Sequence, residues 1–315
     1  MFLALATDLA AIAGVEVAAM RDVRLDVPDP SCLRVYPVRS RRDDETLFAR
    51  LAAQSDWTVV IAPEFDGHLL DRCRRVISAG GRLLGPSPTL VEMAADKHRT
   101  AEHLTAAGVP VPEGLPLDTG QLLPAGIRGP ALLKPRFGAG SQGIRLLRST
   151  DTGHGGPFVA DCPSRLERVC PGTAVSVALL CGAAGRFPLV PCHQHLSDDG
   201  RFTYLGGSLP VEDRLARRAT ELAGRALTAM PDAYGYLGVD LVLGADACGG
   251  QDVVIEINPR LTTSYVGLRA AVGEGVNLAE AMLDVCEGRR PRLSFRPGRL
   301  HFEPDGTVHP LAGDP

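Results

Sequence analysis

Apolar and polar positions along the first third of the chain alternate in the manner of a small layered α/β unit. Residues 2–13 and 67–79 carry apolar side chains at helical spacing, and a Gly-Gly pair ends the second of these helices. Short apolar runs at 15–20, 58–62 and 82–85 are typical of strands. Alternating helices and strands favour a layer whose strands run parallel. Such a layer ordinarily begins with a strand, whereas this sequence begins on a helix, so the absence of a first strand is left open.

The rest of the chain mixes helices with many short strands. Pro86-Ser87-Pro88 marks a boundary, after which helices are predicted at 88–94 and 96–107. Residues 114–147 then show only strand-like patterns, and residues 291–315 predict a terminal hairpin. Further strands are predicted at 166–169, 174–180, 187–195, 202–205, 237–243 and 252–258, and further helices at 212–230 and 277–287. This part of the chain is therefore expected to be α+β.

The composition argues against several classes of function. Lys plus Arg number 33 against 37 for Asp plus Glu, so the net charge of −4 gives no support to a nucleic-acid partner. The basic runs at 39–42 and 72–75 are expected to be solvated surfaces. No apolar run reaches the length of about 18 residues that a membrane helix needs, and no basic signal-peptide region precedes the first apolar residues. None of the eight cysteines forms a C-x-x-C pair, and the cytoplasm, with reduced thiols, is the expected compartment.

A glycine-rich loop with a lysine at its root is the first candidate for chemistry. Residues 134–143 read Lys-Pro-Arg-Phe-Gly-Ala-Gly-Ser-Gln-Gly and lie between apolar runs at 131–133 and 144–147, which predicts the tip of a β-hairpin. Backbone N–H groups of such a loop can surround a polyphosphate while Lys134 supplies positive charge. The string also fits G-x-G-x-x-G, but that dinucleotide motif must open a helix, and a strand follows here. Protein kinases place their lysine after the loop, so they do not fit either.

A polar pair on an apolar strand is the second candidate. Glu256 and Asn258 are two residues apart in Val-Val-Ile-Glu-Ile-Asn-Pro-Arg and therefore share one face of the strand. If the preceding turn centres on Cys248, Asp240 lies directly opposite Glu256. Carboxylate and amide oxygens grouped in this way suit Mg²⁺, and Arg260 is placed to reach phosphate oxygens. The alternative left open is a buried acid cluster neutralised by Arg or Lys neighbours.

Taken in order, these motifs resemble those of the ATP-grasp superfamily of ATP-dependent carboxylate–amine ligases. The resemblance covers residues 56–290. Its motifs are Asp96-Lys97 before a helix that ends in Gly-Val-Pro-Val-Pro, Leu133-Lys134-Pro135 with the glycine loop, Glu167-Arg-Val-Cys-Pro-Gly172, Gly238-Val-Asp240 and Glu256-Ile-Asn258-Pro-Arg260. It implies an ATP-grasp fold with a Rossmann-like N-terminal α/β domain over 1–87, a lid subdomain over 88–166, a C-terminal subdomain with the metal site over 167–290 and a hairpin tail over 291–315. ATP would lie between the two α+β subdomains.

The resemblance also implies roles for individual residues. The ATP phosphates would be bound by Lys97, Lys134 and the loop residues Gly138, Gly140, Ser141 and Gly143. The adenine would pair with backbone groups of Glu167, Arg168 and Val169. Two Mg²⁺ ions, with Mn²⁺ as an alternative, would be bound by Asp240, Glu256 and Asn258. Lys134 and Arg260 would be catalytic. The sequence departs from the family pattern at Ala174, where many relatives have a glutamate that binds ribose.

A narrower resemblance concerns the substrates. Ala62-Pro-Glu64, Leu84-Gly-Pro-Ser and the stretch after Asn258 look like the tyramine–glutamate ligase branch, which serves methanofuran-type cofactor synthesis. This implies attachment of glutamate to an aromatic amine such as tyramine or tyrosine. Candidate substrate residues are Glu64, Gln194, Thr262, Thr263, Ser264 and Tyr265. Two alternatives stay open: the Thr-Thr-Ser-Tyr stretch is a polar turn that caps the next helix, and Glu64 is an exposed loop acid.

The remaining histidines carry less weight. His193 and His195 alternate with Cys192 and Gln194 along a strand, so their side chains diverge and a transition-metal site is disfavoured. The histidines at 68, 98 and 103 are expected to be ordinary surface residues on helices. No G-x-S-x-G elbow is present for a hydrolase.

The sequence thus predicts a Mg²⁺-ATP-dependent ligase that forms an amide through an acyl phosphate. Small-molecule amine and amino-acid substrates are its expected partners, without nucleic acid or membrane, and a homodimer is left open. The alternative from another class is a non-catalytic nucleotide sensor on the same fold.

Overall fold

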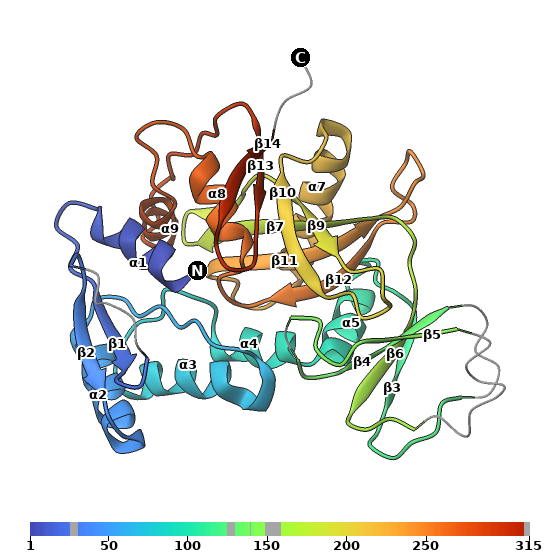
Figure 1. The fold of residues 1–315 in the computed structure, drawn as a ribbon, viewed down its shortest axis with the longest axis horizontal. Coiled ribbons are helices and arrows are strands. Elements are labelled where there is room, and N and C mark those ends of the chain that lie inside the picture. The colour runs from blue at the N-terminus through green and yellow to red at the C-terminus, as the bar shows by residue number, and fades with distance from the viewer. Residues whose placement is uncertain (26–30, 125–129, 139, 149–158, 312–315) are drawn as a thin grey trace.

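A large sheet, a four-stranded sheet and a small parallel pair of strands organise the molecule (Figure 1). The computed structural model describes residues 1–25, 31–124, 130–138, 140–148 and 159–311. The parallel pair lies at one end of the long axis and the four-stranded sheet at the other, with α3, α4 and α5 running between them (Figure 1). Ala139 of the glycine loop and residues 312–315 of the predicted tail lie outside the described residues.

The N-terminal elements form a layer with parallel strands, as predicted. They are α1 (Phe2–Ala10), β1 (Ala18–Asp22), β2 (Arg34–Val38), α2 (Arg41–Gln54), the short 3₁₀ helix η1 (Phe65–Gly67) and α3 (His68–Ser78). β1 and β2 pair in parallel. The predicted strands at 58–62 and 82–85 are wrong as full strands, because they meet only in one parallel bridge between Thr58 and Leu83.

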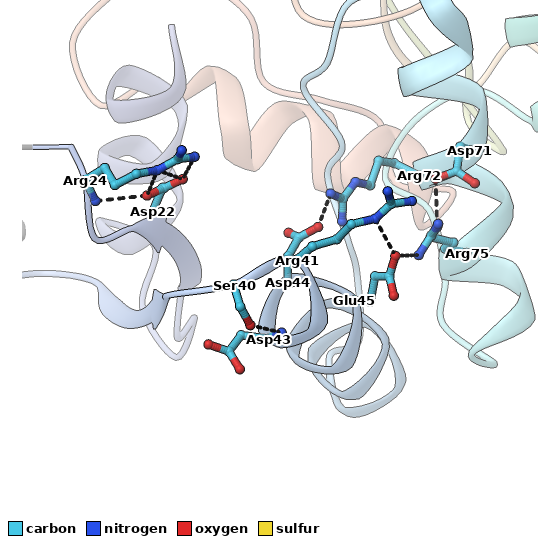
Figure 2. Close-up of polar contacts among 10 residues, drawn as sticks. All are labelled: Asp22, Arg24, Ser40, Arg41, Asp43, Asp44, Glu45, Asp71, Arg72 and Arg75. Carbon is cyan, nitrogen blue, oxygen red and sulfur yellow. Dashed lines mark hydrogen bonds and ion pairs between the residues drawn. The ribbon is translucent and has the colours of Figure 1, made fainter.

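Helix α2 was not predicted, and a network of ion pairs joins it to α3. Ser40 accepts a hydrogen bond from the backbone N–H of Asp43 at 3.1 Å, which caps the first turn. Arg72 of α3 pairs with Asp44, and Arg75 lies 2.7 Å from Asp71 and 3.8 Å from Glu45 (Figure 2). The basic run at 72–75 is therefore partly engaged in the contact between two helices rather than simply solvated.

The four-stranded sheet carries the predicted glycine-loop hairpin. Its strand order is β3-β6-β4-β5, with β4 antiparallel to β5 and Ala131 opposite Leu147. Helices α4 and α5 precede it, as predicted, and Asp96 separates them. The elements are α4 (Pro88–Ala95), α5 (Lys97–Ala106), β3 (Gly114–Leu117), β4 (Ala131–Pro135), β5 (Arg145–Leu147) and β6 (Ser164–Arg168). Hydrophobic side chains of Leu117, Leu133 and Leu166 fill the core of this sheet.

The large sheet has a buried core on each face. Its order is β12-β11-β7-β9-β10-β13-β14, with β8 paired to β7. Val177 and Val239 belong to the core that includes side chains of α7, whereas Leu180 and Tyr236 belong to the core that includes side chains of α8 and α9. The elements are β7 (Thr173–Gly182), β8 (Gly185–Pro188), β9 (Cys192–Leu196), β10 (Tyr204–Leu209), α7 (Asp213–Ala229), β11 (Gly235–Leu243), β12 (Val253–Asn258), α8 (Ser264–Ala271) and α9 (Leu278–Cys286).

The terminal hairpin is confirmed and extends this sheet. β13 (Arg299–Phe302) pairs with β14 (Val308–Leu311) and also with β10. The single strand predicted at 187–195 is wrong, because Pro188 and Pro191 bracket a break between β8 and β9. No helix in the described ranges combines the length and apolar character that a bilayer-spanning helix requires.

Candidate active site

Two carboxylates face each other across β11 and β12. Asp240 is the direct partner of Glu256, as the sequence predicted, and Gly238 is the partner of Asn258. The register shifts between Asp240 and Leu241, a bulge of the kind often found beside functional sites. Asn258 is 8% exposed, so its amide lies almost fully inside the protein.

Asp240 is held by neutral amides. Its Oδ1 accepts a hydrogen bond from Gln194 at 3.0 Å and its Oδ2 accepts one from Asn258 at 2.9 Å. Burial, and then repulsion from Glu256, raises the pKa of Asp240 to about 7, against the hydrogen bonds from Asn258 and Gln194 and the charge of Arg260. The surrounding protein thus leaves part of the negative charge of this pair uncompensated, and a bound cation would balance it.

Lys97 joins the glycine loop to the carboxylate pair. Its Nζ lies 2.9 Å from Glu256 Oε1 and donates to the carbonyl of Gly138 at 2.6 Å. Asp96 begins α5 by accepting hydrogen bonds from the N–H groups of His98 and Arg99, and it pairs with Arg136 of the loop segment. Although burial opposes it, the hydrogen bonds from Arg136 and from the helix lower the pKa of Asp96. Lys97 is therefore held where α5, the loop and β12 meet.

Lys134 lies in a second, deeper charge cluster. Its Nζ is 2.6 Å from Glu167 Oε1, and both side chains are at most 4% exposed. Glu167 Oε2 pairs with Arg165 at 3.0 Å. Arg165 also contacts His98 Nδ1 at 2.7 Å. His98 is 8% exposed, so its prediction as an ordinary surface histidine is wrong.

The glycine loop makes a tight turn between these clusters. Gly140 and Gly143 adopt positive φ angles of 66° and 74°, and Ser141 does so at 59° although it carries a side chain. A Cβ at Gly143 would lie 2.9 Å from Pro135 Cγ, so this position needs glycine for space as well as for its backbone angle.

The predicted adenine-binding segment keeps part of its backbone engaged within the protein. The N–H of Arg168 donates to the carbonyl of Glu113 at 2.9 Å, and that of Val169 donates to the carbonyl of Pro130 at 3.3 Å. The Glu167 side chain is occupied by Lys134 and Arg165. Adenine recognition by this segment stays a prediction.

Arg260 meets Glu64 across 196 residues of sequence. Arg260 Nε lies 2.9 Å from Glu64 Oε1, and Nη2 donates to Oε2 at 3.1 Å. Glu64 is 5% exposed, so the alternative of an exposed loop acid is wrong. Glu64 and Arg260 are therefore ion-pair partners, with side chains that are 3% and 14% exposed.

The Thr-Thr-Ser-Tyr stretch runs into the first turn of α8, and the hydroxyl groups of Thr262, Ser264 and Tyr265 bond within the protein. Thr262 Oγ1 and Ser264 Oγ are 2.8 Å apart, and each lies 3.1 Å from the Tyr236 hydroxyl. Thr263 occupies the N-cap position of α8 without a side-chain capping bond. The alternative of a polar turn that caps the helix is not borne out, because the stretch supplies no side-chain capping bond, and Thr262 and Thr263 are partly exposed.

The hydroxyl of Tyr265 is engaged by α1. It is 1% exposed, and its hydroxyl donates to Asp8 of α1 at 2.7 Å, where Arg269 also binds. Tyr265 therefore connects α8 to α1, and we leave it out of the proposed substrate site.

Replacing Tyr265 by phenylalanine is expected to lower the free energy of unfolding by about 1–2 kcal/mol, because a buried hydroxyl that donates to a charged group is lost. Denaturant unfolding would measure this, with the partly exposed Tyr36→Phe as control. Unchanged stability together with a several-fold higher KM for one substrate would return Tyr265 to the substrate site.

The histidine pair behaves as the strand pattern predicted. His193 pairs with Glu212 at 3.2 Å, and His195 contacts Ser208 at 3.0 Å. Within the described residues, no group of three or more His, Cys, Asp or Glu side chains is arranged to hold a metal ion. The two carboxylates and the Asn258 amide are thus a smaller set, which needs oxygens from another molecule to complete a magnesium shell.

Three contributors to the site were not found from the sequence. Arg165, Arg136 and His98 all act through contacts between segments that are 40 or more residues apart. The signal that was available is positional: Arg165 is two residues before Glu167, so both side chains share one face of β6.

Comparison with known families matches most of the chain to two models. An ATP-grasp domain model matches residues 94–264, and a pre ATP-grasp domain model matches residues 15–91. The first match includes Lys97, Lys134, Asp240, Glu256 and Arg260.

Two of the relatives found by sequence carry the same enzyme name. Tyramine–L-glutamate ligase of Methanocaldococcus fervens is 24% identical over 79% of this chain and 74% of its own length. The Methanocaldococcus jannaschii enzyme of the same name is 23% identical over 68% of this chain and 58% of its own.

Solved structures agree on the fold. An ATP-grasp superfamily protein from Archaeoglobus fulgidus superposes with a TM-score of 0.64 at 21% identity, over 91% of this chain and 92% of that one. Biotin carboxylase from Campylobacter jejuni, in complex with an ATP analogue, superposes with a TM-score of 0.72 at 16% identity, over 95% of this chain and 72% of that one. These similarities confirm the fold predicted from the sequence.

Proposed function

The chain belongs to the ATP-grasp family of ADP-forming carbon–nitrogen ligases, and from this membership we propose that it joins glutamate to an aromatic amine. Tyramine and tyrosine are the first amines to test, because the two named relatives are tyramine–L-glutamate ligases. The proposed setting is methanofuran-type one-carbon cofactor synthesis. The observation that carries the proposal is the Asp240–Glu256 pair, directly opposed on β11 and β12 and contacted by Lys97 from the glycine-loop side.

The reaction requires charge stabilisation more than a protein nucleophile. A substrate carboxylate takes the terminal phosphoryl group of ATP, ADP leaves, and the amine then displaces phosphate to form the amide. Negative charge develops on phosphoryl oxygens in the first step and on the carbonyl oxygen and the departing phosphate in the second, and preorganised cations stabilise it. Lys97 and Lys134 would bind the phosphates, and Arg260 would hold the acyl phosphate in a forked contact. The N–H groups of Gly138, Gly140, Ser141 and Gly143 would complete the phosphate contacts.

Magnesium fits the site because two carboxylates lie side by side there. Asp240 and Glu256 are adjacent acids, and neutral amides are the hydrogen-bond donors to Asp240, so a divalent cation would relieve their repulsion. Asp240, Glu256 and Asn258 would hold it, and two ions are proposed, with Mn²⁺ as an alternative metal. When bound, magnesium supplies positive charge to the phosphate oxygens.

The amine and acid are proposed to bind between the carboxylate pair and the Glu64–Arg260 pair. Gln194 faces Asp240, and Thr262 and Thr263 follow directly on Arg260 along the chain. Glu64 would attract a substrate ammonium group and Arg260 a substrate carboxylate or acyl phosphate, in competition with the ion pair that the two side chains form.

Glu64→Gln is expected to raise the KM of the amine or amino-acid substrate about tenfold, with a smaller change in the KM of ATP, because one charge-assisted hydrogen bond is worth about 1.5–3 kcal/mol. Steady-state kinetics with each substrate varied in turn would measure this. Glu92→Gln, in an exposed pair with Arg74, is the control. Equal changes in all KM values would mean that Glu64 only supports the fold.

The proposed function is tested by ADP release with glutamate and an amine supplied together and separately. Release that requires both substrates, with an amide product of the summed mass less water, supports it. Release with other amino-acid pairs but not with glutamate would keep the reaction and overturn the substrate.

A further inference from the structure

Lys134 and Arg165 are like charges in direct opposition. They are register partners on the antiparallel strands β4 and β6, and each is 3% exposed. Two cations at such a position destabilise a sheet unless a third group compensates them. Glu167 provides that compensation, since one carboxylate oxygen meets Lys134 at 2.6 Å and the other meets Arg165 at 3.0 Å. One negative and two positive charges leave the cluster with a surplus positive charge.

The Arg165 guanidinium extends beyond Glu167 to the segment before β3. Its Nη2 donates to the carbonyl of Pro112 at 2.7 Å. Gly114, the register partner of Glu167, makes room for this path, because a Cβ there would lie 3.0 Å from Arg165 Cζ and 2.6 Å from the carbonyl of Leu166. The absence of a side chain at Gly114 on β3 thus leaves the space that the Arg165 guanidinium of β6 occupies.

The same guanidinium reaches the helix that carries Lys97. Arg165 Nη1 lies 2.7 Å from His98 Nδ1, and His98 directly follows Lys97 at the start of α5. Because arginine can only donate, His98 Nδ1 accepts, and the ring is neutral with its proton on Nε2. Burial and the charge of Arg165 lower the pKa of His98 despite the opposing charge of Glu102, which agrees with a neutral ring.

Arg165 therefore contacts Glu167, the partner of Lys134, and also His98, the neighbour of Lys97 in the chain. Lys97 and Lys134 are the only two lysines of the chain, and the other 31 of its 33 Lys plus Arg residues are arginines. We propose that Arg165 is a positioning residue for ATP, whose guanidinium holds Glu167 and His98 so that the two ammonium groups stay available to phosphate oxygens. The inference rests on the proposed function, because it assumes that both lysines bind ATP.

The consequence of losing Arg165 follows from charge. Glu167 would then face Lys134 alone, and the buried ammonium would sit in a neutral ion pair that phosphate must disrupt. α5 would also lose its polar contact with β6 through His98. Both changes weaken nucleotide binding, whereas a purely structural ion pair would affect only the stability of the fold.

The test is calorimetric binding of Mg²⁺-ADP and of a non-hydrolysable ATP analogue to Arg165→Met. We expect the Kd to rise roughly 10- to 100-fold, the range for loss of one buried charge-assisted contact. The matched control is Arg218→Met, since Arg218 forms a largely buried pair with Asp252 and also donates to a carbonyl, that of Gly244. This control should lower the melting temperature and leave the Kd unchanged. Arg165→Lys restores charge without the contacts to His98 and Pro112 and should recover part of the affinity.

Two further variants distinguish failure of the positioning role from failure of the proposed ATP site. Lys134→Ala with unchanged nucleotide affinity would overturn the proposed site itself. If Lys134→Ala weakens binding while Arg165→Met binds as tightly as the Arg218→Met control, the positioning role is wrong and the proposed site stands. If Arg165→Met does not fold, His98→Leu takes its place, because it removes the acceptor of Nη1 and otherwise only a contact with the exposed Glu102 at 3.4 Å. A rise of about threefold or more in its nucleotide Kd supports the role, and an unchanged Kd overturns it.

Discussion

Lys134→Ala is expected to reduce kcat/KM for ATP by roughly 10²- to 10³-fold, the loss measured when one preorganised donor to a developing charge is removed. The ammonium is 3% exposed and fixed by Glu167, so it is already in place before phosphate arrives. Glu167 keeps Arg165 as a partner in the variant, so the carboxylate is not left as an isolated buried charge. Steady-state ADP release with ATP varied is the measurement.

Arg186→Ala is the control for this variant, because Arg186 is an exposed cation on β8. It should leave kcat/KM for ATP unchanged. A Lys134→Ala enzyme within a factor of about three of the wild type would remove Lys134 from the site, since that factor corresponds to less than 1 kcal/mol.

Glu256→Gln is expected to abolish measurable substrate-dependent ADP release, a loss of roughly 10³-fold or more, because two functions of one carboxylate disappear together. Glutamine keeps the size of the side chain but cannot neutralise Lys97, which lies 2.9 Å away, and it halves the acidic charge available to magnesium. The effect should fall on kcat more than on the KM of the amine. Single-turnover formation of ADP is the measurement.

Glu280→Gln, an exposed acid on α9, controls for the loss of one negative charge from the chain. Nucleotide binding by Glu256→Gln separates the two functions of the carboxylate. If the variant binds Mg²⁺-ADP as well as the wild type and also turns over, the acidic pair is a structural ion-pair cluster, which is the alternative that the sequence left open.

The sequence predicted that Asp240 lies opposite Glu256 because local rules determine this pairing. β11 and β12 are consecutive strands joined by residues 244–252, and a connection centred on Cys248 places Asp240 opposite Glu256 without any long-range information. The glycine-loop hairpin follows from the same logic, since β4 and β5 are neighbours in sequence as well as in the sheet. Such contacts need only strand periodicity and a turn.

What the sequence did not reveal depends on tertiary contacts. Helix α2 begins with Arg-Arg-Asp-Asp-Glu, and a strongly charged first turn hides the narrow apolar stripe that packs it, although Ser40 offered a capping signal. His98 resembles any polar residue on a helix until Arg165 approaches it from a strand 67 residues away. Glu64 and Arg260 are 196 residues apart, and the residues around each of them do not indicate that the two side chains pair.

Formation of an amide product tests the central claim most directly. Purified protein, Mg²⁺, ATP, glutamate and tyramine or tyrosine would be combined, and both ADP and the product mass would be measured. The account predicts stoichiometric ADP and amide, each dependent on both substrates and absent with Glu256→Gln. Tight ATP binding without ADP release, across a broad panel of acids and amines, would contradict it and indicate a nucleotide sensor.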